Sequence, residues 1–233
     1  MNDKLVEFCG VSKNFGSKIL VDNVSFHLKN KEITTLIGQN GAGKTTIAKM
    51  ILGLEKPNKG QINLRKNLRI SYAPQKLDFN FNMPLTGGGL LSILTFAGIN
   101  KDSLKLINFV DIESLKNTDL SKLSGGQLQK LILAGSLVNI CDLVILDEPT
   151  QYLDLATQQQ FYNDLNQIKD KTGLTIFMIS HDLFTVMKNS DQVICINGHI
   201  CCTGKPNEIN ENLSFKNALS EIGVYVHSHD HKH

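Results

Sequence analysis

The sequence predicts an α/β fold in which a parallel sheet, an antiparallel β subdomain and a helical insertion share one chain of 233 residues. Unbroken apolar runs at Leu143–Leu146 and Leu174–Ile179 are typical of buried, parallel strands. Alternation of apolar and polar residues near the start of the chain is typical of an antiparallel sheet with one wet face. A mostly helical, leucine-rich stretch from about Met83 to Leu137 separates these β-rich parts.

The remaining elements follow from the same patterns. Alternation or short apolar runs predict strands at Leu5–Val11, Val24–Leu28, Ile33–Ile37, Leu68–Ala73, Val193–Ile196 and His199–Cys202. The last two flank Asn197-Gly198, a strong signal for a tight hairpin. Helices are expected over Ile47–Leu54 and Leu155–Lys171, and Pro57-Asn58-Lys59-Gly60 is predicted to be a turn.

Composition limits the class of protein. Hydrophobic residues make up 41% and charged residues 20%, as in globular chains, and a net charge of +2 gives no reason to expect nucleic acid as a partner. The chain lacks an apolar run long enough to span a membrane and an apolar signal region at its start. The five cysteines include no CxxC pair, so we expect reduced thiols and a place in the cytoplasm or on its side of a membrane.

The firmest functional signal is the loop Gly38-Gln39-Asn40-Gly41-Ala42-Gly43-Lys44-Thr45, which fits the phosphate-binding pattern between a strand and a helix. Its glycines let the backbone point N–H groups at anionic oxygens. Lys44 brings a charge to the β- and γ-phosphates, and the Thr45 hydroxyl can ligate Mg²⁺. A glycine-rich turn that matches by chance is the alternative. The residues expected to bind the nucleotide here are Gly38, Asn40, Gly41, Gly43, Lys44, Thr45 and Thr46.

Two carboxylates follow the apolar run at Leu143–Leu146. Asp147 can hold magnesium, directly or through water, and Glu148 can act as general base toward an attacking water. A surface acidic pair after a core strand would be the ordinary explanation. Together with the phosphate loop, the pair indicates an ATP-hydrolysing enzyme.

A second anion site is predicted at Leu123-Ser124-Gly125-Gly126-Gln127, where Ser124 can cap the following helix. One triphosphate needs one cradle, so the economical interpretation is that this site serves a nucleotide bound to another copy. The alternative is a flexible turn before a helix. The segment resembles the signature motif of the ATP-binding cassette family.

This resemblance implies roles for further residues. Phe15 matches an aromatic that stacks on adenine, although a core phenylalanine is the alternative. Gln75 matches a glutamine that reaches the metal and the water, and Asp154 matches an aspartate that crosses a dimer interface. His181 matches the switch histidine at the γ-phosphate. The implied Mg²⁺ ligands are Thr45, Gln75 and Asp147, and the implied catalytic residues are Glu148, His181 and Lys44.

The family also implies an architecture: a P-loop NTPase fold with a RecA-like core, an antiparallel β subdomain and a helical insertion subdomain. We assign residues 1–82 and 138–226 to the nucleotide-binding core with its β subdomain, 83–137 to the helical subdomain and 227–233 to a histidine-rich tail. The expected assembly is a homodimer that binds ATP between its copies.

Some positions depart from the family pattern. Lys130 and Gly135 stand where arginine is frequent, and Gln151-Tyr152 replaces a pair of small residues. The glycine run Gly87-Gly88-Gly89 occupies the expected start of a helix, which puts in doubt how rigidly that helix is set.

The cargo is indicated by other segments. Those that resemble the ATPases of zinc importers are Leu68–Leu77, Met83–Thr86, Asn197–Gly204 and Ile222–His233. The resemblance implies a subunit on the cytoplasmic face of the inner membrane, with a membrane permease and an extracytoplasmic zinc-binding protein as partners. Alternatives are a manganese or iron importer ATPase, a non-transport ATPase of the same family, and a nucleotide-binding regulator without catalysis.

Histidines suggest a further metal site. His227, His229, His231 and His233 alternate, so an extended chain would place them on one face as Zn²⁺ ligands. The alternative is a solvated end without function. Cys201-Cys202 beside His199 could also bind metal, but adjacent strand residues point to opposite faces, and a buried hairpin is the better interpretation.

Overall fold

Two β-sheets and a group of helices make up the computed structural model, which describes residues 3–75 and 84–210. The strands are β1 Lys4–Phe15, β2 Lys18–Lys29, β3 Ile33–Ile37, β4 Lys59–Leu64, β5 Ile70–Ala73, β6 Leu143–Asp147, β7 Thr175–Ser180, β8 Gln192–Asn197 and β9 His199–Gly204. The helices are α1 Lys44–Ile51, α2 Gly87–Leu94, α3 Lys101–Leu106, α4 Ile112–Leu115, α5 Gly125–Val138, α6 Leu155–Thr172, α7 Leu183–Asn189 and α8 Pro206–Asn210, with a 3₁₀ turn at Leu120–Lys122.

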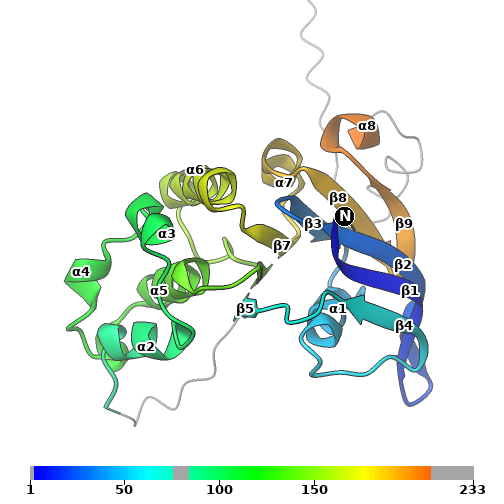
Figure 1. The fold of residues 1–233 in the computed structure, drawn as a ribbon, viewed down its shortest axis with the longest axis horizontal. Helices are drawn as coiled ribbons and strands as arrows, with labels where there is room; N and C mark the ends of the chain where they lie inside the picture. Colours follow the sequence, from blue (N-terminus) through cyan, green and yellow to red (C-terminus); the bar gives the residue numbers. More distant parts are fainter. Residues whose placement is uncertain (1–2, 76–83, 211–233) are drawn as a thin grey trace, which may run out of the picture.

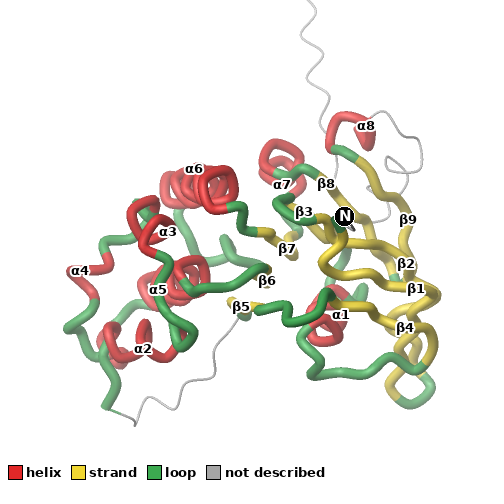
Figure 2. The backbone as a smooth tube through the Cα atoms, viewed as in Figure 1, coloured by secondary structure: helices red, strands yellow, loops and turns green. Residues whose placement is uncertain are grey.

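The two sheets are of the kinds that the sequence predicts, one antiparallel and one mostly parallel. The smaller one is antiparallel, in the order β2-β1-β4, and the larger one runs β5-β6-β7-β3-β8-β9. Strands β5, β6, β7, β3 and β8 are parallel, and β9 returns antiparallel through the hairpin at Gly198. Figure 1 shows helices α2 to α5 gathered on the side away from the antiparallel sheet, and Figure 2 shows the same arrangement, with α1, α7 and α8 lying beside the strands. The predicted α/β fold class is confirmed.

The unbroken apolar run of β6 has a clear physical reason. Val144 and Leu146 point into a core cluster with α5 and α6, whereas Leu143 and Ile145 point into a second cluster with α1 and the antiparallel sheet. Because both faces of the strand are covered, every position is buried.

Strand β4 was not predicted from the sequence. Its first residues, Lys59 and Gly60, were predicted to be part of a turn, and that prediction is wrong. Most β4 side chains are exposed, so the strand has no hydrophobic pattern and depends on pairing with β1. A Cβ atom at Gly60 would lie 2.3 Å from the Gly10 carbonyl oxygen, so this pairing needs glycine there.

The glycine run at the start of α2 is firmly docked. Gly87 N donates to Thr118 O at 2.9 Å and Gly88 N to Lys116 O at 2.7 Å. A Cβ atom at Gly87 would lie only 2.4 Å from the Leu115 carbonyl oxygen. The run therefore permits a close backbone approach that sets the helix in place, which answers the doubt about its rigidity.

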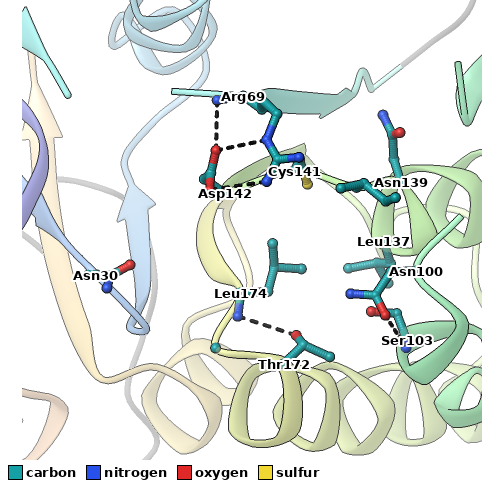
Figure 3. A pocket seen from close by; sticks show the side chains of 12 residues that line it. Asn30, Arg69, Asn100, Ser103, Leu137, Asn139, Cys141, Asp142, Thr172 and Leu174 are labelled. Atoms are coloured by element: carbon teal, nitrogen blue, oxygen red, sulfur yellow. Dashed lines mark hydrogen bonds and ion pairs between the residues drawn. The ribbon is translucent and has the colours of Figure 1, made fainter. Parts of the chain in front are cut away.

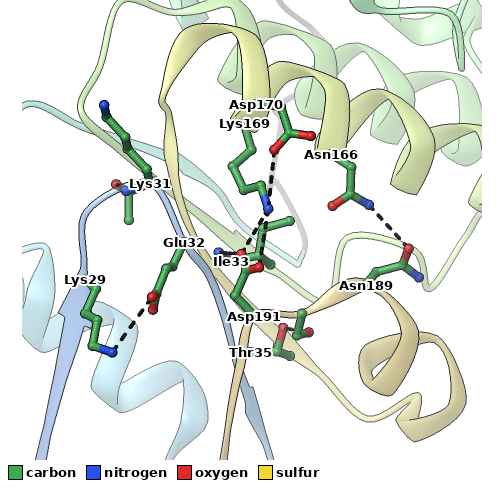
Figure 4. Close-up of polar contacts among 12 residues, drawn as sticks. Lys29, Lys31, Glu32, Ile33, Thr35, Asn166, Lys169, Asp170, Asn189 and Asp191 are labelled. Carbon is green, nitrogen blue, oxygen red and sulfur yellow. Dashed lines mark hydrogen bonds and ion pairs between the residues drawn. The ribbon is translucent and has the colours of Figure 1, made fainter. Parts of the chain in front are cut away.

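Polar contacts fix the amino ends of β3 and β8 to α6, as Figure 4 shows. Asp191 accepts a hydrogen bond of 2.8 Å from Ile33 N and pairs with Lys169 Nζ at 3.1 Å, while Thr35 and Ser190 are joined at 2.7 Å. The strand that leads to the phosphate loop is thus anchored at its start. In the described ranges, no helix has both the length and the apolar character needed to cross a bilayer.

Candidate functional site

The phosphate loop lies between β3 and α1, at the carboxyl end of a central parallel strand, where ligands bind in open α/β sheets. Gly41 and Gly43 have φ angles of 84° and 96°, in the region that favours glycine. A Cβ atom at Gly38 would lie 2.2 Å from the Ile196 carbonyl oxygen. The glycines of the motif are therefore required by this backbone.

Lys44 is buried at the centre of the loop. Its Nζ donates to Gly38 O at 2.8 Å and to Gln39 O at 3.1 Å, and it lies 3.9 Å from Glu148 Oε1. Burial lowers the pKa of Lys44, while the charges of Glu148 and Asp147 oppose that shift. The ammonium group is therefore held in the loop at a position where it can bind an anionic ligand.

Asp147 and Thr45 form a set of hard oxygen donors. Thr45 Oγ1 donates to Asp147 Oδ2 at 3.1 Å, and the Tyr72 hydroxyl lies 3.4 Å from the same oxygen. Asp147 Oδ1 is buried and has no hydrogen-bond partner among the described residues. Burial raises the pKa of Asp147, and the hydrogen bond from Thr45 opposes the shift. An unsatisfied carboxylate oxygen beside a hydroxyl fits the ligand preference of Mg²⁺.

Glu148 and His181 are brought together by neighbouring strands. Asp147 pairs with Ile179 across β6 and β7, so the residues that follow these strands lie at one sheet edge. His181 Nδ1 is 2.6 Å from Glu148 Oε2, although the sequence separates them by 33 positions. The Glu148 backbone is left-handed, with a φ of 50°.

Most of these residues line a cavity of about 260 Å³, whereas Gly38, Tyr72 and His181 are not among the residues that line it. It is lined by Lys18, Leu20, Gln39, Asn40, Gly41, Gly43, Lys44, Thr45, Thr46, Gln75, Asp147 and Glu148. Lys18 and Leu20, at the start of β2, were missed by the sequence analysis, because no motif marks them. Phe15 is 49% exposed and pairs with Lys18 across the β1–β2 hairpin, so it lies beside this cavity and not in the core.

The segment predicted to form a second anion site lies apart from the cavity. Ser124 caps α5 in a reciprocal box: Gln127 N donates to Ser124 Oγ at 3.2 Å, and Ser124 N donates to Gln127 Oε1 at 2.9 Å. Neither residue, nor Gly125 or Gly126, lines the cavity. A Cβ atom on Gly126 would lie 3.2 Å from Tyr152 O, so the signature motif adjoins the segment before Asp154.

Two of the residues that depart from the family pattern have polar partners, and a third is explained by close packing. Lys130 Nζ donates to Thr157 Oγ1 at 3.1 Å and lies 3.9 Å from Asp154, which caps α6. Gln151 Oε1 accepts a hydrogen bond of 2.9 Å from Gln75 Nε2. A Cβ atom at Gly135 would lie 2.9 Å from Leu94 Cβ, so α2 leaves no room for a larger side chain.

A second, polar cavity of about 230 Å³ lies at the opposite, amino end of β6 and β7 (Figure 3). Arg69, Asn139 and Asp142 are among the residues that line it, and none of the predicted site residues does so. Asn139 Oδ1 is buried without a hydrogen-bond partner among the described residues.

Cys201 and Cys202 lie in the β8–β9 hairpin, which is the interpretation that the sequence favours over a metal site. Cys202 is buried opposite Cys195, while Cys201 Sγ lies 4.0 Å from His199 Nε2. Within the ranges that the structure covers, no group of three or more His, Cys, Asp or Glu side chains could hold a metal ion. The four tail histidines lie outside the described residues.

Known proteins resemble this chain along its length. The family model described as "ABC transporter" matches residues 21–151. The protein named "Zinc import ATP-binding protein ZnuC" of Rickettsia conorii is 54% identical over 100% of both chains. The protein of the same name from Buchnera aphidicola subsp. Baizongia pistaciae is 42% identical over 98% of each chain. A solved structure described as "Structure of ATP binding subunit of ABC transporter" has a TM-score of 0.81 at 23% identity, covering 94% of this chain and 100% of that chain.

Proposed function

The chain belongs to the ABC transporter family, and from this premise we propose that it is the ATP-hydrolysing subunit of a zinc importer. The assignment of zinc as the cargo rests on the 54% identity, over the whole chain, to a protein named for zinc import. The observation that supports hydrolysis is the convergence of Lys44, Asp147 and Glu148 on one cavity.

ATP binds with its phosphates in the loop at residues 38–45. Backbone N–H groups and the Lys44 ammonium offset the phosphate charge, and Phe15 stacks on adenine beside Lys18. Thr45, Asp147 and Gln75 would hold Mg²⁺, which when bound neutralises part of the charge on the phosphates.

Glu148 is the general base. Its carboxylate is 8% exposed and stands at the cavity wall, where it can accept a proton from the attacking water. His181, hydrogen-bonded to the same carboxylate, orients it, and its exposed ring is the group that we propose contacts the γ-phosphate. Lys44 offsets the charge that develops on the transferred group.

The complete site needs a second copy of the chain. Ser124, Gly125, Gly126 and Gln127 lie outside the cavity that holds the phosphate loop, which supports a homodimer in which each copy supplies this segment to its partner's ATP. Asp154 lies at the same interface. ATP closes the dimer, and hydrolysis lets it open.

The helical subdomain, residues 83–137, carries this motion to the permease. The core with its β subdomain, residues 1–82 and 138–226, holds the nucleotide. We place the protein at the cytoplasmic face of the inner membrane, bound peripherally to the permease, with an extracytoplasmic zinc-binding protein delivering the cargo. Nucleic acid is not a partner in this proposal.

The decisive experiment is transport. The chain and its permease, reconstituted in lipid vesicles with the zinc-binding protein, should move Zn²⁺ only with hydrolysable ATP. Manganese and iron, offered at equal concentrations, should be transported at least tenfold more slowly. Preferred transport of manganese or iron would assign the chain to an importer of that metal instead.

The tail is proposed to bind Zn²⁺ through His227, His229, His231 and His233, so that cytoplasmic zinc is sensed or buffered. This part of the proposal rests on the alternating histidines in the sequence. A chain truncated after Val226 should lose zinc affinity, and transport should stop responding to cytoplasmic zinc. If the truncated chain keeps both properties, the tail has no such role.

A further inference from the structure

A buried lysine lies near the end of β1, outside the phosphate loop. Lys13 is only 9% exposed, although lysine is rarely buried without a partner. Its Nζ pairs with Glu55 Oε2 at 2.8 Å and donates to Lys56 O at 2.8 Å. The ammonium group is therefore held at a fixed position.

The same ammonium lies over the ring of Phe15, 4.8 Å from its centroid. This distance is within the range of a cation–π interaction. Phe15 remains 49% exposed, and its cross-strand partner Lys18 lines the nucleotide cavity. The ring thus has a fixed cation over it and still offers exposed surface beside the cavity.

The segment that holds Lys13 follows directly after α1, the helix that begins at the phosphate loop. Two further hydrogen bonds join this segment to β1: Asn58 N donates to Ser12 O at 2.8 Å, and Asn14 N donates to Asn58 Oδ1 at 2.9 Å. The amino end of α1 adjoins the phosphate loop, and the segment after its carboxyl end holds the strand that carries Phe15. One helix therefore links the two ends of the nucleotide site.

We propose that Lys13 is a positioning residue for the nucleotide base. By holding one side of the Phe15 ring, it keeps the ring oriented for stacking with the base of a purine nucleotide and reduces the ordering cost of binding. The inference rests on the proposed function, because it needs ATP to bind at this cavity with its base on Phe15. It adds a residue that acts only on the base and not on the phosphates.

The test compares ATP with inorganic tripolyphosphate, which has the phosphates but no base. In the full-length chain, Lys13→Met should raise the dissociation constant for ATP about threefold to tenfold, as expected for loss of one cation–π contact and the order it imposes. The constant for tripolyphosphate should not change. Lys13→Arg, which keeps a cation over the ring, should bind ATP like the wild type. Lys29→Met, which removes an ion-paired lysine on β2, is the matched control.

The role through Phe15 is tested by a double variant. In a Phe15→Leu background, Lys13→Met should weaken ATP binding no further. Equal weakening of ATP and tripolyphosphate binding, or a full additional loss in the Phe15→Leu background, would overturn the proposal.

Glu55→Gln provides the test if Lys13→Met does not fold, because it loosens the ammonium without removing it. It should weaken ATP binding and leave tripolyphosphate binding unchanged, and unchanged ATP affinity would contradict the inference. A wild-type chain that binds neither ligand would contradict the proposed function, and this inference with it.

Discussion

The imidazole of His181 and the carboxylate of Glu148 lie 2.6 Å apart, yet the histidine is 60% exposed and the glutamate only 8%. The exposed ring thus covers and orients a buried carboxylate. Because burial strips water from the carboxylate, its remaining partners decide where it points.

Glu148→Gln should reduce ATP hydrolysis about 10²- to 10⁴-fold, because an amide cannot take the proton of the attacking water. ATP binding should persist, since Lys44 and the loop are unchanged, and ATP-bound dimers should accumulate. Phosphate release and size-exclusion chromatography with ATP measure the two effects. Glu113→Gln, at an exposed carboxylate in α4, is the control. Hydrolysis by Glu148→Gln at the wild-type rate would remove the assignment of the base.

Gln151→Leu should raise the Mg²⁺ concentration needed for half-maximal hydrolysis by about threefold to tenfold, the effect of one lost hydrogen bond. Gln75 donates its amide N–H to Gln151, which leaves its carbonyl oxygen for the metal. Gln151→Glu keeps an acceptor and should behave like the wild type. Titrations of Mg²⁺ at saturating ATP measure the shift, with Gln159→Leu on the exposed face of α6 as control. An equal shift for the leucine and glutamate variants at position 151 would contradict this role.

Asp147→Asn should abolish hydrolysis but stabilise the nucleotide-free protein in chelator at neutral pH. Burial raises the pKa of Asp147 in the folded state above its value in the unfolded chain. Folding therefore favours the protonated form, and stability is lost as the pH rises through the pKa of the folded state. Asparagine remains neutral and avoids this cost. Thermal unfolding should therefore show a higher Tm for the variant at pH 7, with the difference shrinking as the pH falls. A lower Tm at pH 7 would show that the ionised carboxylate stabilises the empty site.

Asp164→Ala should lower the free energy of unfolding by about 3 kcal/mol, because it leaves buried N–H groups without an acceptor. Asp164 is fully buried in α6 and accepts hydrogen bonds from Phe109 N at 2.9 Å and Gln160 Nε2 at 2.8 Å. Urea denaturation measures the loss. Asp170→Ala, on the same helix but 71% exposed at its side chain, should change stability by less than about 0.5 kcal/mol. Similar losses in both variants would argue against a special role for the buried carboxylate.

The sequence was most informative where local chemistry determines structure. The glycines at 38, 41 and 43 are needed by the backbone itself, and the apolar run before Asp147 identifies a doubly covered strand whose end carries functional groups. Such features depend on residues that are adjacent in the sequence, so the α/β fold and the phosphate loop could be predicted from it.

Other features depend on residues that are distant in sequence. Nothing near Lys13 indicates that its ammonium lies over Phe15 and pairs with Glu55, and nothing near Gln75 indicates Gln151 as its partner. Strand β4 was missed for a related reason, because an exposed, polar strand exists only through its pairing with β1. These contacts arise from packing of the whole chain and could not be predicted from spacing.

The left-handed backbone at Glu148 restricts how this position can change in evolution. A φ of 50° is unfavourable for β-branched side chains and tolerable for asparagine, aspartate and glycine. A lineage that loses hydrolysis while keeping the fold would therefore be expected to drift at this position toward such residues and away from valine, isoleucine and threonine. The conformation of one residue thus limits which inactive descendants of this ATPase can arise without rebuilding the end of β6.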